Sequence, residues 1–408
     1  MPPPSADPGA VPEQPGSQSA LRLSNQQRII RSLLDQGALT QAELSRQTGL
    51  STATVSNIVR TLIERELVTT SPVTSSGRRA LAVSVVDAGA VAVGLDFGRR
   101  HTRVLLASLG YEIIAEETME TDLEQGARVR IDAAATLLAR VLAVAGRPRA
   151  SVLGVGVGIP GSIDLRTGRA AESSILPEWD GVDENTISDR LKLPVYLEND
   201  ANLGALAEIT WGPHTGTADL VFVKIATGIG AGLILGGKPI RGNIGVTGEL
   251  GHTPIHEHGL LCSCGNRGCL ETVASTRIML EILERGTLPS TNPTDIVQNA
   301  LAGDRQTLRV IDDAGRAVGL SLATIANVVN PEKFIIGGPL ADLGELLLVP
   351  IRAGFQRYAI PVVAGSTSIL MSSLGDKAEA LGAASLVLLR PESSEFAMGS
   401  LSGFALTS

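Results

Sequence analysis

The sequence predicts an α/β protein in which a small helical domain with a β-wing precedes a larger two-lobed body that carries a cysteine-rich loop. Three observations support this fold class. Apolar residues at helical spacing, interrupted by a glycine turn, occupy the N-terminal quarter of the chain. Apolar strands that end in glycine-rich turns occur near residue 91 and again near residue 220, as expected for two lobes of similar construction. All three cysteines of the chain lie between positions 262 and 269, close to a histidine.

The composition is typical of a globular protein with more than one domain. The chain has 408 residues, a net charge of −8 and 3% aromatic residues, and this length allows two or three domains with a sizeable core. No apolar run reaches the length of a membrane span, and the N-terminus lacks the basic-then-apolar pattern of a signal peptide. We therefore expect a cytoplasmic protein with no membrane partner.

Charge is unevenly distributed along the chain. Residues 21–85 contain eight arginines and four acidic residues, a balance of +4, whereas the chain from residue 86 onward carries −10. A basic segment on an acidic body indicates that only this segment meets a polyanion. The expected parts of the chain are a disordered segment at 1–20, a small domain at 21–86, a two-lobed body at 87–390 and a flexible tail at 391–408.

The small domain has the pattern of a helix-turn-helix. Apolar residues recur at helical spacing from Ser24 onward. Thr40 and Glu43 can form a capping box at the start of a second helix, and Gly49 makes the turn to a third helix that begins at Ser51. The residues expected to face inward from this third helix are Val55, Ile58, Val59, Leu62 and Ile63.

The outward side of the third helix is polar, and a basic hairpin follows it. Strands are expected over 67–71 and 80–85, and the loop between them ends in two arginines. This arrangement predicts a winged helix-turn-helix whose third helix enters the major groove and whose wing contacts phosphates or the minor groove. The expected DNA-binding residues are Ser51, Thr52, Thr54, Ser56, Asn57, Arg60, Arg78 and Arg79. The alternative is a helical cap used only for dimer contacts, but the basic balance and the arginine pair favour DNA.

The cysteine cluster predicts a structural zinc site. Three thiolates and one imidazole make a closed tetrahedral set with no open position for water. The expected metal ligands are His252, Cys262, Cys264 and Cys269, with His256 or His258 as alternatives to the first. Buried free cysteines, or a disulfide with one odd thiol, are the other interpretations. The clustering of every cysteine beside a histidine and the lack of a secretory signal make both less favourable.

This stretch resembles the zinc signature of the ROK family, which comprises repressors, open reading frames and sugar kinases. Gly-His, six residues, Gly, two residues and Cys-x-Cys-Gly-x-x-Gly-Cys-x-Glu run from Gly251 through Glu271 without a gap. The resemblance implies that the zinc loop shapes one wall of a sugar pocket. It further implies that Glu249, His252 and Glu271 contact sugar hydroxyls, His252 while it also binds zinc.

Motifs of the body extend the resemblance to the two-lobed actin-like ATPase (ribonuclease H-like) fold. A strand that ends in Asp96-Phe-Gly98 resembles the first phosphate loop, and Thr227–Gly232 resembles the second. In kinases of the family a second glycine follows, where this chain has Arg99. A long cationic side chain would occupy the space of the nucleotide phosphates, which counts against ATP binding. Helices of the body are expected over 127–145, 270–284, 305–329 and 378–389.

Two further segments supply the other expected sugar contacts. A Gly-Pro-Gly loop that ends at Gly161 resembles the family's Gly-x-Pro-Gly motif beside the sugar. The strand before Asn199 and Asp200 ends in groups that suit a sugar, since a carboxylate there can take a proton from a hydroxyl. The resemblance implies that Asn199 holds the sugar and that Asp200 matches the kinase base, here vestigial. The alternative is a helix cap formed by this Asx pair.

These observations favour a sugar-responsive transcriptional regulator, a repressor of carbohydrate uptake or catabolism genes, over an ATP-dependent sugar kinase or a bifunctional kinase–regulator. The head and Arg99 favour the regulator, whereas Asp200 and the second phosphate loop favour the kinase. No catalytic residue is expected to be active, and zinc is the expected cofactor. The expected partners are a double-stranded DNA operator with an inverted repeat, a sugar effector, and a second copy of the chain in a homodimer or homotetramer.

Overall fold

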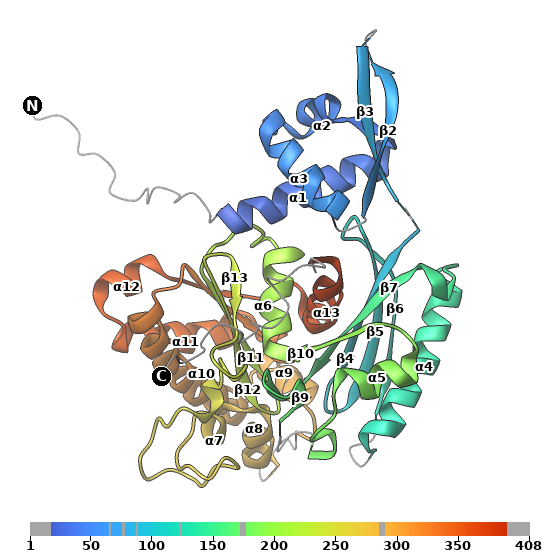
Figure 1. The fold of residues 1–408 in the computed structure, drawn as a ribbon. Coiled ribbons are helices and arrows are strands. Elements are labelled where there is room, and N and C mark those ends of the chain that lie inside the picture. The colour runs from blue at the N-terminus through green and yellow to red at the C-terminus, as the bar shows by residue number, and fades with distance from the viewer. Residues whose placement is uncertain are drawn as a thin grey trace, which may run out of the picture.

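The computed structural model describes residues 18–64, 67–75, 78–86, 89–121, 125–171, 177–284 and 290–389. These residues form a small head above a two-lobed body (Figure 1). The N-terminal segment before Gln18, the tip of the wing at 76–77 and the tail from 390 lie outside the described residues, as do the expectations made for them. In the part of the chain that is described, no helix is both long and apolar enough to cross a membrane.

The head is a winged helix-turn-helix, as the sequence predicts. Its elements are α1 (Gln18–Gln36), β1 (Leu39–Thr40), α2 (Gln41–Thr48), α3 (Thr52–Glu64), β2 (Val68–Ser75) and β3 (Arg78–Val85). Thr40 and Glu43 form the predicted capping box, and Gly49 adopts a φ of 68° at the turn. The three strands pair in the order β1-β3-β2. Two details differ from expectation: α1 begins six residues before Ser24, and Ile63, at the end of α3, is 42% exposed rather than inward-facing.

The first lobe of the body contains a five-stranded sheet in the order β10-β7-β4-β5-β6. These strands are β4 (Val91–Phe97), β5 (His101–Ser108), β6 (Ile113–Glu120), β7 (Val152–Ile159) and β10 (Val195–Asn199). Helices α4 (Ala127–Val144) and α5 (Glu184–Leu191) cover one face, and the short strands β8 (Ile163–Asp164) and β9 (Arg169–Ala170) form a separate hairpin.

The second lobe repeats this topology with the order β13-β12-β11-β14-β15. Its strands are β11 (Leu220–Ile225), β12 (Ile229–Leu235), β13 (Lys238–Ile240), β14 (Lys333–Gly337) and β15 (Ser368–Met371). Its helices are α7 (Glu271–Ala274), α8 (Thr276–Leu283), α9 (Pro293–Leu301), α10 (Arg305–Val329), α11 (Glu345–Tyr358) and α12 (Pro361–Ser366). In each lobe the first three strands are antiparallel and the next two are added in parallel. This repeat confirms the predicted two-lobed actin-like fold.

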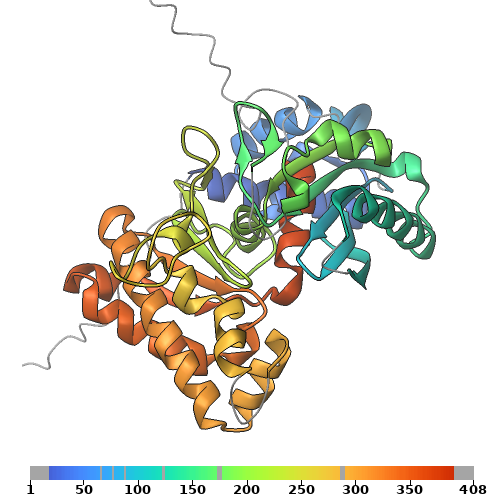
Figure 2. The ribbon, with the colours of Figure 1, turned by 90° about the horizontal axis from the view of Figure 1, so that it is seen from below.

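Two helices lie between the lobes, α6 (Asp200–Thr210) and α13 (Ala378–Leu389). The helix that follows the last strand of each lobe packs on the sheet of the other lobe. A Cβ on Gly232 of β12 would lie 2.2 Å from the carbonyl oxygen of Ala201 in α6, and one on Gly156 of β7 would lie 1.8 Å from that of Ala383 in α13. Figure 2, a view from below, shows α13 in red between the two lobes.

The head and the body share one hydrophobic core. Ile29, Ile30 and Leu33 of α1 belong to the same buried cluster as Leu105 on β5 and Leu381 on α13. Because this cluster is continuous, the head rests on the body through packed side chains as well as through the chain connection near residue 88.

Candidate functional site

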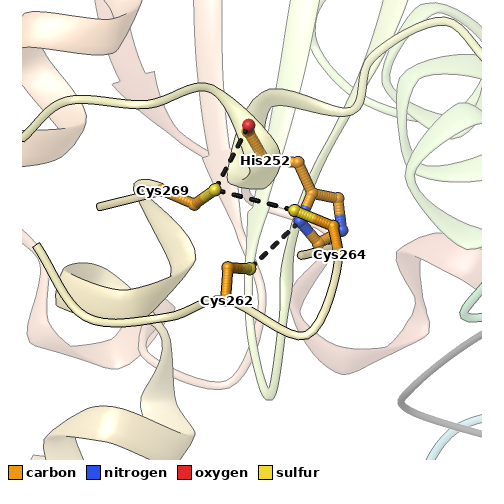
Figure 3. A group of neighbouring side chains, drawn as sticks. All are labelled: His252, Cys262, Cys264 and Cys269. Carbon is orange, nitrogen blue, oxygen red and sulfur yellow. Dashed lines mark hydrogen bonds between the residues drawn. The ribbon is translucent and has the colours of Figure 1, made fainter. Parts of the chain in front are cut away.

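The four predicted metal ligands lie together in a loop of the second lobe (Figure 3). One ligand atom from each of His252, Cys262, Cys264 and Cys269 lies within 4.8 Å of every other. Cys264 Sγ is 3.7 Å from Cys269 Sγ, and Cys262 Sγ is 3.5 Å from His252 Nδ1. Tetrahedral zinc with ordinary bond lengths places two sulfurs about 3.8 Å apart and a sulfur and a nitrogen about 3.6 Å apart. The residues therefore fit a zinc ion and exclude a disulfide, whose sulfurs would be bonded at about 2 Å.

Glycine at position 268 allows the zinc loop to close on itself. Gly268 has a φ of 64°, and a Cβ there would lie 1.6 Å from the carbonyl oxygen of His256. His256 and His258 are exposed and lie outside the ligand cluster. Of the three histidines considered as the fourth ligand, His252 is the one placed with the cysteines.

The first lobe brings three of the predicted sugar-binding residues together. Asn199 Nδ2 donates to the carbonyl oxygen of Gly161 at 3.1 Å, and Asn199 Oδ1 accepts from the amides of Ala201 and Asn202. Asn199 is thus the N-cap of α6, so the capping alternative describes a real contact. This cap fixes the position of Asp200, which is 8% exposed and begins the helix.

The second lobe contributes the facing residues. Glu249 Oε1 accepts a hydrogen bond of 2.5 Å from Ser162 Oγ of the first lobe, so the two lobes touch at this point. Glu249 Oε2 lies 3.8 Å from His252 Nε2, whose other ring nitrogen faces Cys262. Glu271 is 5% exposed, and its Oε2 accepts from the amide of Ile229 in the second phosphate loop. A metal bound at Nδ1 would therefore leave Nε2 free to face the same space as Glu249.

Buried ion pairs tie the sugar motif to the second lobe, and sequence reasoning missed them. Lys224 Nζ on β11 lies 2.9 Å from Asp200 Oδ2 and 2.8 Å from Glu379 Oε1 on α13. Burial would lower the pKa of Lys224, but these two carboxylates raise it above its ordinary value. Arg241 Nε also donates to Glu198 Oε2 at 2.7 Å. The continuous apolar run of β11 carries no sequence signal that its one lysine pairs with carboxylates of two helices.

The first phosphate loop is filled by a side chain that the sequence did not single out. His101 Nε2 lies 2.7 Å from Asp96 Oδ2, and the ring covers Gly98, where a Cβ would lie 2.0 Å from His101 Cε1. Arg130, itself 1% exposed, donates to the carbonyl oxygens of Gly98 and His101. Arg99 was expected to block this loop, but the imidazole of His101 is the group that lies against Gly98.

The predicted DNA-binding face is exposed on the head. Ser51, Thr52, Ser56, Asn57 and Arg60 are exposed along α3, and Thr54 is half-buried. Ser51 Oγ accepts from the amide of Thr54 and so caps the helix, whereas an Arg60 guanidinium nitrogen lies 2.6 Å from Asn57 Oδ1. In the wing, Arg78 pairs with Ser75 across the strands and Arg79 pairs with Thr74, with the Arg79 side chain exposed.

Comparisons with known proteins agree with this construction. Residues 92–390 match the model of the ROK family, and residues 24–79 match that of the MarR family. The chain is 29% identical over 390 residues to the xylose repressor of Caldicellulosiruptor bescii, covering 91% of this chain and 97% of that protein. It is 31% identical over 321 residues to the glucokinase of Halalkalibacterium halodurans, covering 74% of this chain and 96% of that one.

A solved structure shares the whole arrangement. A ROK family transcriptional regulator, a homologue of the Escherichia coli MLC protein, aligns with a TM-score of 0.69 and 26% identity over 91% of this chain and 96% of that chain. A winged head on a sugar-kinase-like body defines a class of proteins built as transcriptional regulators. The chain belongs to the ROK family, with a MarR-type DNA-binding domain at its N-terminus.

Proposed function

We propose that the protein is a sugar-responsive, DNA-binding repressor of carbohydrate uptake or catabolism genes. The observation that carries this proposal is the presence, in one packed chain, of a basic winged head and a boundary between the lobes where polar groups of both lobes meet at Ser162 and Glu249. The xylose repressor relative covers 91% of this chain, whereas the glucokinase relative covers 74% of it.

The proposed sugar pocket uses groups that suit vicinal hydroxyls. Gly161, Asn199, Asp200, Glu249, His252 and Glu271 are the proposed contacts. Buried carboxylates and amides recognise hydroxyls because an analogue without them leaves these groups unpaired. A zinc ion on His252 and the three cysteines would hold this wall in place as a structural ion, with no reaction step assigned to it.

The kinase alternative is supported by the glucokinase relatives and by the second phosphate loop. Against it stand two contacts of this chain. His101 fills the space over Gly98, and Lys224 pairs with the carboxylate of Asp200 that would act as base. Because Lys224 already occupies one oxygen of this carboxylate, Asp200 is better suited to hold a sugar than to activate it.

A homodimer or a tetramer is proposed for specific DNA binding. One winged head makes few base contacts, and two heads related by a two-fold axis would read an inverted repeat. The second lobe offers an exposed apolar surface where α10, α11 and α12 meet, which supports the proposal. Its residues are Val328, Tyr358, Ile360 and Val362, each at least half exposed.

Calorimetry and DNase footprinting test the proposed function. D-xylose and D-glucose, the sugars that the relatives' names suggest, are titrated into the protein with and without ATP. Footprinting on DNA beside the protein's own gene should show a protected inverted repeat, and the effective sugar should change that protection. Asp200→Asn and Glu249→Gln should abolish the sugar response but retain DNA binding, and Asp132→Asn on α4 serves as a surface control. A normal sugar response in both pocket variants would show that the pocket is misplaced.

A further inference from the structure

Helix α6 connects the proposed sugar pocket with the head. It begins at Asp200, directly after Asn199, and ends at Thr210 next to Trp211. Eleven helical residues span about 16 Å, and all eleven are buried. The two ends of one rigid element therefore lie at the two sites that a regulator must couple.

The head contacts the C-terminal end of α6 directly. Gln27 Nε2 of α1 donates to the carbonyl oxygen of Thr210 at 3.1 Å. The Trp211 indole donates to Leu381 O at 3.1 Å and to Ser385 Oγ at 2.8 Å, both on α13. The ring of Tyr111 lies edge-on to Trp211 at 5.5 Å between centroids, and both rings pack against the core shared by head and body. A shift of α6 would change these contacts at once.

The pocket end of α6 is held by charges that a sugar would meet. Lys224 bridges Asp200 on α6 and Glu379 on α13, so one ammonium ion joins the first residues of both helices. A hydroxyl that binds Asp200 competes with Lys224 for the same carboxylate. The position of α6 relative to α13 is thereby linked to the occupancy of the pocket.

Helices α6 and α13 are packed too closely for a shift of one helix to be taken up in the space between them. A Cβ on Gly382 of α13 would lie 1.9 Å from the carbonyl oxygen of Leu203 in α6, so the backbones are in contact where the helices cross. Closely packed interfaces change between discrete arrangements rather than by gradual deformation. A displacement at Asp200 is therefore passed to Thr210 and Trp211 instead of fading along the helix.

We propose that α6 carries the sugar signal to the DNA-binding head. Sugar at Asn199 and Asp200 rearranges the Asp200–Lys224–Glu379 contact and so moves α6 against α13. This movement changes how α1 packs at Thr210 and Trp211. This inference rests on the proposed function and names its regulation. A sugar acts this way only if it binds the two arrangements of α6 with different affinity. The factor by which sugar changes DNA affinity then equals the factor by which DNA changes sugar affinity.

The test measures this coupling factor in variants of the head end. DNA affinity for the footprinted duplex is measured with and without D-xylose or D-glucose, and sugar affinity with and without DNA. In wild type, sugar should change DNA affinity by the same factor by which DNA changes sugar affinity. This factor should lie within the range of about 5–150-fold that is usual for coupled sites. Gln27→Ala and Trp211→Phe should each reduce this factor several-fold and leave sugar affinity without DNA nearly unchanged. Trp179→Phe, which changes the other tryptophan, inside the first lobe, should keep the full factor.

A second measurement remains usable if a variant folds poorly. Sugar binding should change the tryptophan emission of wild type, and this change should be absent in Trp211→Phe but present in Trp179→Phe. Full coupling in Gln27→Ala and Trp211→Phe, or a sugar-induced emission change that arises from Trp179, would overturn the route through α6. If wild type binds DNA and sugar but neither ligand changes the affinity for the other, both the route through α6 and the proposed sugar regulation are wrong. If it binds neither ligand, the proposed function itself is wrong.

Discussion

His101 and Asp96 form a hydrogen-bonded pair inside the first phosphate loop, with His101 Nε2 2.7 Å from Asp96 Oδ2. Burial alone would raise the pKa of Asp96, but the imidazole keeps it below its ordinary value. The pair places an aromatic ring over Gly98, at the point where a nucleotide-binding loop needs bare backbone. The loop keeps the aspartate and glycine of a nucleotide site but not the space for a phosphate.

This pair predicts that the protein neither binds ATP nor phosphorylates sugars. Calorimetry with ATP and magnesium should give no binding heat, with or without D-glucose. The double variant Arg99→Gly/His101→Thr opens the loop and should gain measurable ATP binding, whereas Arg100→Gly alone should not. Turnover by wild type at rates of about 1–100 s⁻¹, usual for kinases, would contradict the prediction.

The cysteine loop predicts about one zinc per chain in reduced, freshly purified protein. Cys264→Ser removes one thiolate and should weaken zinc binding by at least about tenfold, since even the loss of an outer-shell partner costs that much. Sugar affinity should fall with it, because His252 and Glu249 lose their support, while the head keeps its DNA affinity. Ser263→Ala, at the adjacent position, is the matched control. Metal analysis that finds no zinc in wild type would refute the site.

Local patterns in the sequence predicted most of the elements. The boundaries of α10 and α13 match the predicted ranges because apolar periodicity extends over each of these helices. The expected helix over 270–284 is instead two helices, since Ser275 adopts an extended conformation and caps the second at Ile278. Apolar spacing alone does not reveal a break of one residue when the cap lies inside an apolar run.

Contacts between distant segments were not predictable from the sequence. The cysteine spacing is local, so the metal cluster could be predicted, and the structure brings those ligand atoms together. Lys224 and Arg241 contact the sugar motif across the lobes, and no spacing rule relates a strand lysine to a carboxylate 24 residues earlier. The same holds for His101, whose ring direction depends on the turn between β4 and β5.

A buried carboxyl on α6 predicts a dependence of stability on pH. Glu208 is fully buried, and burial raises its pKa from 4.5 to about 7 although Ser372 donates to it. Because the folded pKa is the higher one, the protonated group contributes stability that is complete below pH about 4.5 and is lost as the pH rises through about 7. The loss attributable to this group should be on the order of 3 kcal/mol. In Glu208→Gln, the free energy of unfolding measured with urea should depend less on pH between pH 5 and 8. Glu120→Gln on β6, the control, should keep the pH dependence of wild type. An unchanged pH dependence in Glu208→Gln would contradict this prediction.

The head offers a prediction that separates base reading from phosphate contact. Asn57 is exposed on α3 and its amide suits a base edge, whereas Arg79 is exposed on the wing. Asn57→Ala should reduce discrimination between the operator and a substituted site by about 1–3 kcal/mol. Arg79→Ala should weaken binding to all sequences alike and lower the slope of log affinity against log salt by about one unit. The same is expected for Arg78→Ala.

Fluorescence anisotropy on operator and scrambled duplexes at several salt concentrations distinguishes these two roles. Arg128→Ala, an exposed arginine on α4 of the body, removes the same charge away from the head and should leave both the slope and the preference unchanged. Because Asn57 Oδ1 is in contact with Arg60, Arg60→Ala is measured in parallel to separate the amide from its neighbour. If Asn57→Ala weakened all duplexes equally, or Arg79→Ala changed the preferred sequence, α3 would not be the reading helix and the wing would carry specificity instead.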